Sequence, residues 1–504
     1  MKLLWIFLMI LAAFYSNAAV RYVSPLGSGN HDGSSWSNSF PGDMLQDAIN
    51  GSTPGDDIWV ASGTYFTTTG LVRTISISMK NGVGIYGSFN GTENSISERI
   101  LTNGPTSIIS GNIGEPGIID NSFHIIHNYG LDNSAVIDGF IIRDANDDRP
   151  PGLINGLGGG IYNDGSGSGN SCSPVIRNCV IINNHASFGG GIFNNGYQGG
   201  ISEPDILSSV IAFNTATGGA GIDNFGLGGN ASPRIENCVV YANTATERAG
   251  GMYCWGGNNG NANPLVLNTV FANNVAPQGG AIVSDRLNSG SGSSGASNPD
   301  FRNCIFKGNE ADLEGPQFIV LGDATFTATY SCIDLTGQSA PNIITGPGIG
   351  NITSDPLFED IEDGRGSDNL WMTQDDGLKL QLSSPCIDSG ENSGVFESDI
   401  IGNQRIINSI VDIGAYEYQG ISTSVNATGN ASMVYPNPTT GDLILPGFYS
   451  TNIPVRIIDQ HGKTIKEIIP YEGKITLIEL PPGIYTIVQE LGVRDNIWCR
   501  IIKQ

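Results

Sequence analysis

The sequence predicts an all-β protein, a right-handed parallel β-helix solenoid followed by a small C-terminal β-sandwich. Three observations lead to this prediction. Glycine makes up 70 of 504 residues and charged residues only 14%, which is unusual for a helical or α/β chain. The centre of the chain repeats itself about every 30 residues. Each repeat holds three short apolar runs separated by Gly, Asn and Pro, a pattern typical of strands joined by tight turns.

A glycine-rich segment marks each repeat. Its copies read GGGIYN, GGGIFN, GAGIDN, GGMYCW and GGAIVS, and they align on Ile161, Ile192, Ile222, Met252 and Ile282 with spacings of 31, 30, 30 and 30 residues. A coil of three strands stacks each strand on its equivalent in the next coil, about 4.8 Å away. The glycines then provide corners with positive φ and allow backbones to approach closely.

A second segment follows each glycine-rich one, opening with proline and carrying an asparagine two residues before an alanine. Its copies read SPVIRNCVIINNHA, EPDILSSVIAFNTA, SPRIENCVVYANTA, NPLVLNTVFANNVA and NPDFRNCIFKGNEA. The equivalent asparagines are Asn184, Asn214, Asn243, Asn274 and Asn309. Stacked coils would place these amides one above another at a corner, where they pair with one another and with the turn backbone.

Cysteine usage agrees with stacked coils. Cys179, Cys238 and Cys304 fall in one column, alternating with Ser209 and Thr269. Successive cysteines would then lie two coils apart, roughly 9–10 Å, beyond the ~7 Å limit for a disulfide. We interpret these three as core thiols. The sequence pairs none of the others and contains no zinc-binding spacing; they are Cys172, Cys254, Cys332, Cys386 and Cys499.

The net charge limits the possible binding partners, and the N-terminal sequence indicates where the protein is located. A formal net charge of -25 argues against nucleic acid, which requires a basic surface. It would also repel a polyanionic glycan unless divalent cations bridged the two. Residues 1–18 contain Lys2, an apolar run too short to span a bilayer, and small residues before the predicted cleavage point. This is the pattern of a signal peptide, and no other segment of membrane length follows.

The repeats and both flanks resemble known families. GGAI at 279–282, FANN at 271–274 and FKGN at 306–309 resemble polymorphic outer-membrane protein repeats of bacterial surface adhesins. Residues 19–125 resemble the N-terminal region of secreted β-helix proteins of the pectate-lyase-like superfold. There, MLQDAIN at 44–50 is expected to be a capping helix and DIWVASGTY at 57–65 the first coil.

The closing segment and the tail carry further resemblances. Residues 346–420 contain DPLFED, LSSPCIDSG, DIIGNQRI and VDIGAYEY and resemble a choice-of-anchor domain. These resemblances imply a β-helix from about residue 56 to 420, with the 30-residue repeats in 126–345. A polar linker is predicted at 421–432, and residues 433–504, with MVYPNPTTGDLIL and IELPPGIYTI, resemble a type IX (Por) secretion sorting domain. This implies a member of the Bacteroidetes and delivery by the type IX machinery.

The pectate-lyase-like resemblance raises the possibility of a polysaccharide lyase, which would need a cation site and a base. Asp144, Asp147 and Asp148 stand beside Arg149, and we interpret this group as a solvated loop. His185 falls in a surface column, and Arg177 and Arg302 share an outward column that three non-basic residues interrupt. Lysines are scarce, with only Lys80, Lys307 and Lys379 between residues 20 and 420. Catalytic residues therefore stay unknown, and a hydrolase pair of carboxylates stays open.

The acidic stretch at 355–376 is a possible calcium site. It lacks both the EF-hand order and the nonapeptide calcium repeat. We therefore expect a solvated loop, predict no cofactor except calcium as an alternative, and leave the metal ligands unknown.

Three functions fit these observations. The leading hypothesis is an adhesin-like surface or released protein that binds glycans, for example around YCWGGNN at 253–259. The alternative is a carbohydrate-active enzyme, a polysaccharide lyase or glycoside hydrolase, on the same β-helix. The third is a purely structural surface component that needs no ligand.

Overall fold

The computed structural model divides the chain into two compact units, which are described separately. The larger unit contains residues 1–380 and 388–417, and the smaller one residues 381–387 and 418–504. The described residues are 18–150, 155–287, 294–338, 348–420, 442–444, 455–459, 463–469, 474–490 and 495–503. The predicted signal peptide, except Ala18, and the predicted linker at 421–432 lie outside them.

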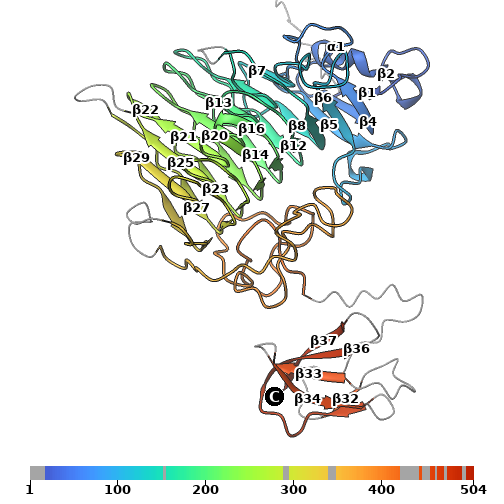
Figure 1. Ribbon diagram of the computed structural model, residues 1–504. Coiled ribbons are helices and arrows are strands. Elements are labelled where there is room, and N and C mark those ends of the chain that lie inside the picture. Colours follow the sequence, from blue (N-terminus) through green and yellow to red (C-terminus); the bar gives the residue numbers. More distant parts are fainter. Residues whose placement is uncertain are drawn as a thin grey trace, which may run out of the picture. The chain divides into compact units, whose positions relative to one another are not determined.

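The larger unit is a parallel β-helix whose chain passes through sheets A, B and C in turn (Figure 1). Sheet A contains β1 (Val20–Ser24), β2 (Phe40–Pro41), β3 (Asp57–Ala61), β5 (Gly84–Phe89), β8 (Val136–Asp138), β11 (Val175–Arg177), β14 (Asp205–Leu207), β18 (Arg234–Glu236), β23 (Leu265–Leu267), β27 (Asp300–Arg302) and β30 (Thr327–Thr329). Sheet B contains β4 (Gly63–Phe66), β6 (Ser107–Ser110), β9 (Phe140–Arg143), β12 (Val180–Ile182), β15 (Val210–Ala212), β19 (Val239–Tyr241), β24 (Val270–Ala272), β28 (Ile305–Lys307) and β31 (Cys332–Ile333). Sheet C contains β7 (Ile126–Tyr129), β10 (Ile161–Asp164), β13 (Ile192–Asn195), β17 (Ile222–Phe225), β21 (Met252–Gly256), β25 (Ile282–Arg286) and β29 (Phe318–Gly322).

Short elements complete the unit. Two parallel pairs lie beside the main sheets, β16 (Thr215–Gly218) with β20 (Thr244–Arg248) and β22 (Gly260–Asn261) with β26 (Gly295–Ala296). The helices are α1 (Leu45–Gly51), η1 (Trp36–Asn38), η2 (Gly42–Met44) and η3 (Ile96–Glu98).

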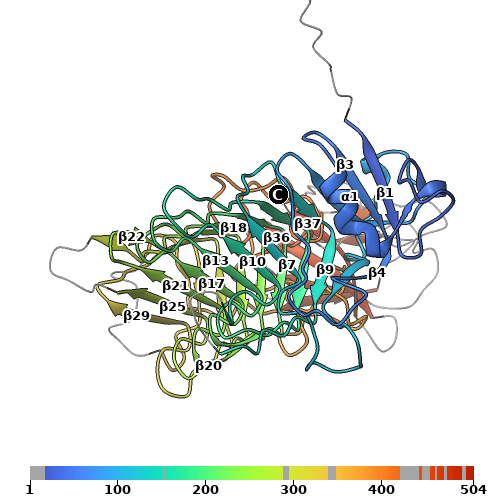
Figure 2. The ribbon, with the colours of Figure 1, turned by 90° about the horizontal axis from the view of Figure 1, so that it is seen from above.

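The register of sheet C confirms the predicted repeat. The residues on which the copies align lie opposite one another on successive strands: Ile161, Ile192, Ile222, Met252 and Ile282. Figure 2 shows these strands side by side. All five side chains are buried in one continuous core. Removing their apolar surface from water stabilises the stack by roughly 25 cal/mol per Å².

The predicted asparagine ladder is also present. Each Nδ2 donates to the Oδ1 of the next coil: Asn184 to Asn214 at 3.1 Å, Asn214 to Asn243 at 3.0 Å, Asn243 to Asn274 at 2.9 Å and Asn274 to Asn309 at 2.9 Å. A second ladder runs inside sheet C from Asn128 through Asn163 and Asn194 to Asn224, at 3.0, 2.9 and 2.9 Å. The sequence reasoning did not identify this second ladder. Both satisfy amides that would otherwise be buried without partners.

The triple glycine before β13 forms a corner, as predicted. Gly189 has a φ of +64°, a conformation that glycine adopts at little cost. A Cβ at Gly190 would lie 2.4 Å from the carbonyl oxygen of Thr215, and one at Gly191 would lie 2.5 Å from that of Gly221. Larger residues here would separate the coils.

The thiols of the predicted column are buried. All cysteines of the described region with placed side chains are free and buried. Burial raises the pKa of Cys179, Cys238 and Cys304 to about 12. They are therefore protonated at neutral pH and pack as small core residues, as predicted.

The N-terminal end departs in part from the prediction. Helix α1 forms where a capping helix is expected, and its Leu45, Ala48 and Ile49 join the core. However, β1 already pairs in parallel with β3, with Arg21 opposite Ile58. The parallel sheet thus begins near residue 20 rather than near 56, because the apolar face of β1 continues the inward column.

The closing segment differs from the predicted β-helix. Residues 353–380 and 388–417 contain no strand, because few apolar runs interrupt their Asp, Gly and Ser. They are attached to the outside of the coils by polar side chains. Asn303 exchanges two hydrogen bonds with the backbone of Glu391 at 2.8 and 2.9 Å, and the Tyr241 hydroxyl donates to the carbonyl oxygen of Ile361 at 3.0 Å.

The smaller unit contains two antiparallel sheets, in agreement with the predicted β-sandwich. One pairs β32 (Asp442–Ile444) with β35 (Lys474–Thr476). The other has the order β34 (Thr464–Ile468), β33 (Val455–Asp459), β36 (Gly483–Glu490) and β37 (Asp495–Lys503). Val455, Ile457 and Ile487 of one sheet share a core with Ile475 of the other.

Replacing Asn214 by alanine is expected to lower the free energy of unfolding of the β-helix by about 3 kcal/mol, because the neighbouring amides lose buried partners. Thr215→Ala changes the adjacent, exposed corner position and is expected to cost less than about 1 kcal/mol. Urea unfolding followed by circular dichroism measures both. Equal effects of the two substitutions would contradict a stabilising ladder.

Candidate functional site

The outward face of sheet C carries a group of aromatic rings. Because side chains alternate along a strand, Ile222 and Asn224 face the core while Asp223 and Phe225 face outward. The register places Asp223 beside Phe193 on the previous coil, and Phe225 beside Trp255 on the next. Neighbouring coils thus bring their outward residues together.

These rings surround a pocket of about 100 Å³. The ring centroids of Phe225 and Trp255 are 5.4 Å apart, those of Tyr197 and Phe225 5.2 Å, and those of Phe188 and Trp255 5.8 Å. Phe188 comes from the glycine corner before β13, and Tyr197 from the turn after it. The lining residues are Leu157, Phe188, Phe193, Asn195, Tyr197, Asp223, Phe225 and Trp255.

Asp223 is the acidic group of this pocket. It is 1% exposed, and its Oδ1 has no hydrogen-bond partner among the described residues. Burial raises the pKa of Asp223 well above its ordinary value, because the charged form loses its hydration. The indole Nε1 of Trp255 also lacks a partner within the described part of the chain. Two buried polar groups are therefore available to a ligand.

The sequence reasoning identified this region only in part. Of the residues at 253–259, Trp255 lies in the pocket, whereas the Tyr253 hydroxyl donates to Asp285 at 3.0 Å. Phe193, Asp223 and Phe225 were missed. They occupy positions one and three residues after the aligned isoleucine, which the alternation of a strand turns outward.

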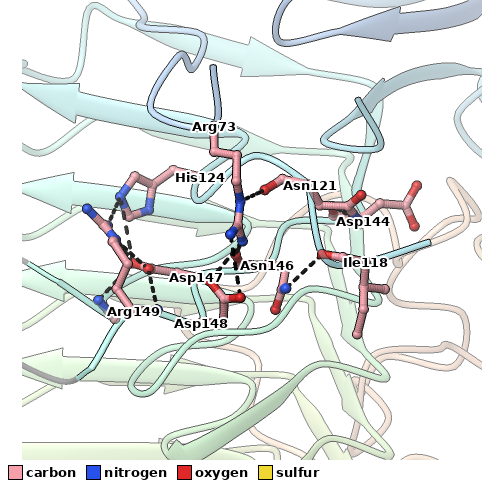
Figure 3. A network of polar contacts seen from close by, with 10 residues as sticks. Arg73, Ile118, Asn121, His124, Asp144, Asn146, Asp147, Asp148 and Arg149 are labelled. Carbon is pink, nitrogen blue, oxygen red and sulfur yellow. Dashed lines mark hydrogen bonds and ion pairs between the residues drawn. The ribbon is translucent and has the colours of Figure 1, made fainter. Parts of the chain in front are cut away.

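The group around Arg149 is an ion-pair network centred on the buried Asp147, and of its acids only Asp148 is exposed as in the solvated loop that we expected (Figure 3). Asp147 is fully buried, and its two oxygens accept from Arg149 at 2.6 and 2.7 Å. Asp147 also accepts from the backbone N–H of Gly156 at 2.8 Å. The guanidinium group of Arg149 also stacks on the ring of Phe123, with its central carbon 4.1 Å from the ring centroid. Such charge-assisted pairing stabilises the segment.

His124 belongs to the same network. Burial lowers its pKa to about 4, so the imidazole is neutral at pH 7. Its Nδ1 lies 2.8 Å from the carbonyl oxygen of Gly158 and carries the proton, which leaves Nε2 to accept from Arg149 at 3.1 Å. This arrangement ties β-helix and loop together.

The remaining acids of the group have their own arginines. Asp148 pairs with Arg73 at 2.9 Å, and Asp144 pairs with Arg143 at 2.7 Å. In Figure 3 dashed lines join Arg73 to Asp148, and Asp144 lies apart from both. The structure therefore brings Asp147, Asp148 and Arg149 together but does not aim the three carboxylates at one point.

The other basic candidates also have local partners. His185 lies in the predicted column, and its Nδ1 is 2.9 Å from Thr215 Oγ1. The remaining candidates, other than Lys80, form ion pairs: Arg177 with Asp138 at 2.6 Å, Arg302 with Asp300 at 2.6 Å, Lys307 with Asp334 at 3.1 Å and Lys379 with Glu359 at 3.2 Å. Lys80 donates to the carbonyl oxygens of Asn50 and Ser52 at 2.8 and 2.6 Å.

The acidic stretch at 355–376 surrounds an open depression, and its carboxylates mainly hold turns. Asp375 accepts from Ser367 and Thr373 hydroxyls at 2.6 and 2.7 Å, and Asp363 pairs with Arg365 at 3.0 Å. Within the described ranges, no group of three or more His, Cys, Asp or Glu residues is placed to hold a metal ion. The solvated loop expected from sequence, with calcium binding as the alternative, stays a prediction.

Asp376 differs from its neighbours in being buried. The hydroxyl of Tyr416 donates to it at 2.7 Å. Burial raises the pKa of Asp376 to about 7. This pair links the acidic segment to the end of the larger unit.

Comparison with known families identifies the tail. Residues 433–503 match the family described as the secretion system C-terminal sorting domain. The chain is a secreted β-helix protein with a type IX sorting domain, which directs it to the cell surface or the medium. The type IX secretion machinery is therefore its partner in export.

Comparison with solved structures finds similar folds, of which one is a pectate lyase. The crystal structure of pectate lyase Pel9A is similar at 15% sequence identity and a TM-score of 0.40, over 80% of this chain and 97% of that chain. A similarity of this degree carries no argument about activity. No curated protein matches the sequence. None of the helices in the described residues has the length and apolar character needed to span a membrane.

Asp376 predicts a pH dependence of stability. Between its ordinary pKa of 3.8 and its folded value of about 7, the folded protein holds a proton that the unfolded chain has released. The contribution of this group to stability therefore falls as pH rises, by on the order of 4 kcal/mol. Asp376→Asn is expected to remove that slope, since its altered hydrogen bonds are the same at every pH.

Unfolding midpoints at pH 4.5, 6 and 7.5 measure this effect. The unfolding midpoint of Asp376→Asn should rise relative to that of the wild type as the pH rises. Glu362→Gln, an exposed change in the same segment, should retain the wild-type slope. A difference between wild type and Asp376→Asn that is independent of pH would contradict the raised pKa.

The sorting domain predicts a change of location. In a host with the type IX system, deletion of residues 433–504 should leave a protease-resistant β-helix in the periplasm, because its coils are complete without the tail. Fractionation and surface labelling measure this. Wild-type amounts of the truncated protein at the cell surface would refute the assignment.

Proposed function

We propose that the β-helix is an adhesin-like binding protein that holds a glycan in the aromatic pocket of sheet C. The observation that carries this proposal is the convergence of five rings from neighbouring coils on one small pocket. A pocket lined mainly by apolar and aromatic groups with a few placed polar atoms is the usual form of a small-molecule site. The rings offer faces for the apolar C–H surfaces of sugars, and the polar atoms offer hydrogen bonds.

The position of the pocket supports binding by a rigid surface. Phe193, Phe225 and Trp255 stand on strands whose backbones are hydrogen-bonded to both neighbouring coils. Sites on such elements hold their geometry with little loss of entropy when a ligand binds. The net charge of -25 disfavours polyanionic glycans without bridging cations.

A second function, a carbohydrate-active enzyme, is favoured by Asp223 itself. Burial raises the pKa of its carboxyl, and a protonated carboxyl is what a glycosidase requires as general acid. Asp285 lies two strands further along the same face and would be the second carboxylate. Product formation separates this function from binding.

A polysaccharide panel, tested with and without calcium, is the experiment. The proposal expects retention of at least one glycan without release of products. Reducing-end products would support a hydrolase, and unsaturated products a lyase. If no glycan is retained, the binding proposal is wrong and the purely structural role remains.

Point variants locate the site on the retained glycan. Trp255→Ala is expected to weaken binding about tenfold, which corresponds to the ~1.4 kcal/mol of a stacked ring. Tyr129→Ala is the matched control, because Tyr129 is an exposed ring on the same sheet, outside the pocket. Equal losses in the two variants would place the site elsewhere.

A further inference from the structure

Asp223 is enclosed by rings and lacks a cationic partner in the described chain. Its strand neighbours are Phe193 and Tyr253. The closest basic group of the adjoining corner strand, Arg248, donates to Gln278 at 3.0 Å and lies 3.9 Å from Asp285. Arg248 also hydrogen-bonds Tyr253, and none of these contacts is with Asp223 itself.

A buried carboxyl without a partner is costly. Leaving such a group unsatisfied costs about 1–3 kcal/mol, and more if it is charged. Native structures rarely retain one unless a ligand, water or ion satisfies it. A ligand with a hydrogen-bond donor directed at Asp223 would satisfy this group.

The aromatic rings favour one kind of hydrogen-bond donor to Asp223 over another. The faces of Trp, Tyr and Phe attract cations, and aromatic cages are a common means of holding ammonium groups. A neutral sugar would hydrogen-bond the carboxyl through a hydroxyl and place its C–H surface on the rings, but it lacks the positive charge that the ring faces attract most strongly. An ammonium group uses both the carboxyl and the ring faces. The pocket of about 100 Å³ is somewhat smaller than a ~150 Å³ cavity that holds a benzene ring, so an ammonium group fits within it.

We propose that the pocket binds the ammonium group of a glycan that contains free amino sugars, with Asp223, which releases its carboxyl proton to solvent as the cation enters, as the anionic partner and Trp255 and Phe225 as stacking faces. This inference rests on the proposed glycan-binding function of the same pocket. The overall negative charge of the chain favours the approach of such a cationic ligand. N-Acetylation, which removes the charge and adds bulk, should abolish the preference.

Matched oligosaccharides test the proposal. Calorimetric titration of the secreted protein at pH 6 compares a glucosamine oligomer with its N-acetylglucosamine counterpart of equal length. We expect at least about tenfold tighter binding of the free amine. Asp223→Asn should remove that preference. Asp205→Asn, which removes a carboxylate from sheet A, should retain it and so exclude a general charge effect.

The outcomes separate the two proposals. Equal or tighter binding of the N-acetylated oligomer, still weakened by Trp255→Ala, would overturn the ammonium site and leave the glycan pocket intact. Binding of neither oligomer overturns the amino-sugar assignment, and the polysaccharide panel then decides the fate of the pocket. Displacement of the glucosamine oligomer by choline chloride would support recognition of the ammonium cation, and no displacement would count against it. If Asp223→Asn does not fold, the wild-type ratio of the two affinities decides.

Discussion

The buried asparagine ladder is the interaction on which the rest of the β-helix depends. Each amide must find a partner in the next coil, about 4.8 Å away, or remain unsatisfied in the core. Asn214 meets this requirement on both sides, accepting from Asn184 and donating to Asn243. A coil that was one residue too long at this corner would lose these bonds. The ladder therefore holds the register of all three sheets.

Register also determines what the outer surface can do. The inward positions are occupied by isoleucine and asparagine. The alternate positions form outward columns, in which the type of residue can differ from coil to coil. In one such column Phe193, Asp223 and Tyr253 follow one another, and in the next Asn195, Phe225 and Trp255. A pocket forms where the outward side chains of neighbouring coils differ, although the backbones of these coils follow the same course.

The sequence was informative in the repeated coils, where equivalent residues stack, and much less so elsewhere. Columns such as Ile161 to Ile282 and Cys179 to Cys304 followed from spacing alone, since stacked coils place equivalent residues together. The pocket did not, because Phe188 and Tyr197 reach it from turns whose course spacing does not determine. The burial of Asp147 depends on Phe123 and Gly156, which no local pattern connects to it. The irregular course of the closing segment likewise depends on contacts with corner side chains.

The central claim is that the pocket of sheet C is the ligand site of a rigid β-helix. A crystal structure of the protein with a bound oligosaccharide from the retained glycan tests it most directly. The account predicts a sugar ring stacked on Trp255, with a donor within hydrogen-bond distance of Asp223 and with the strands β13, β17 and β21 in their present register. An oligosaccharide bound elsewhere, with this pocket empty, would contradict the account.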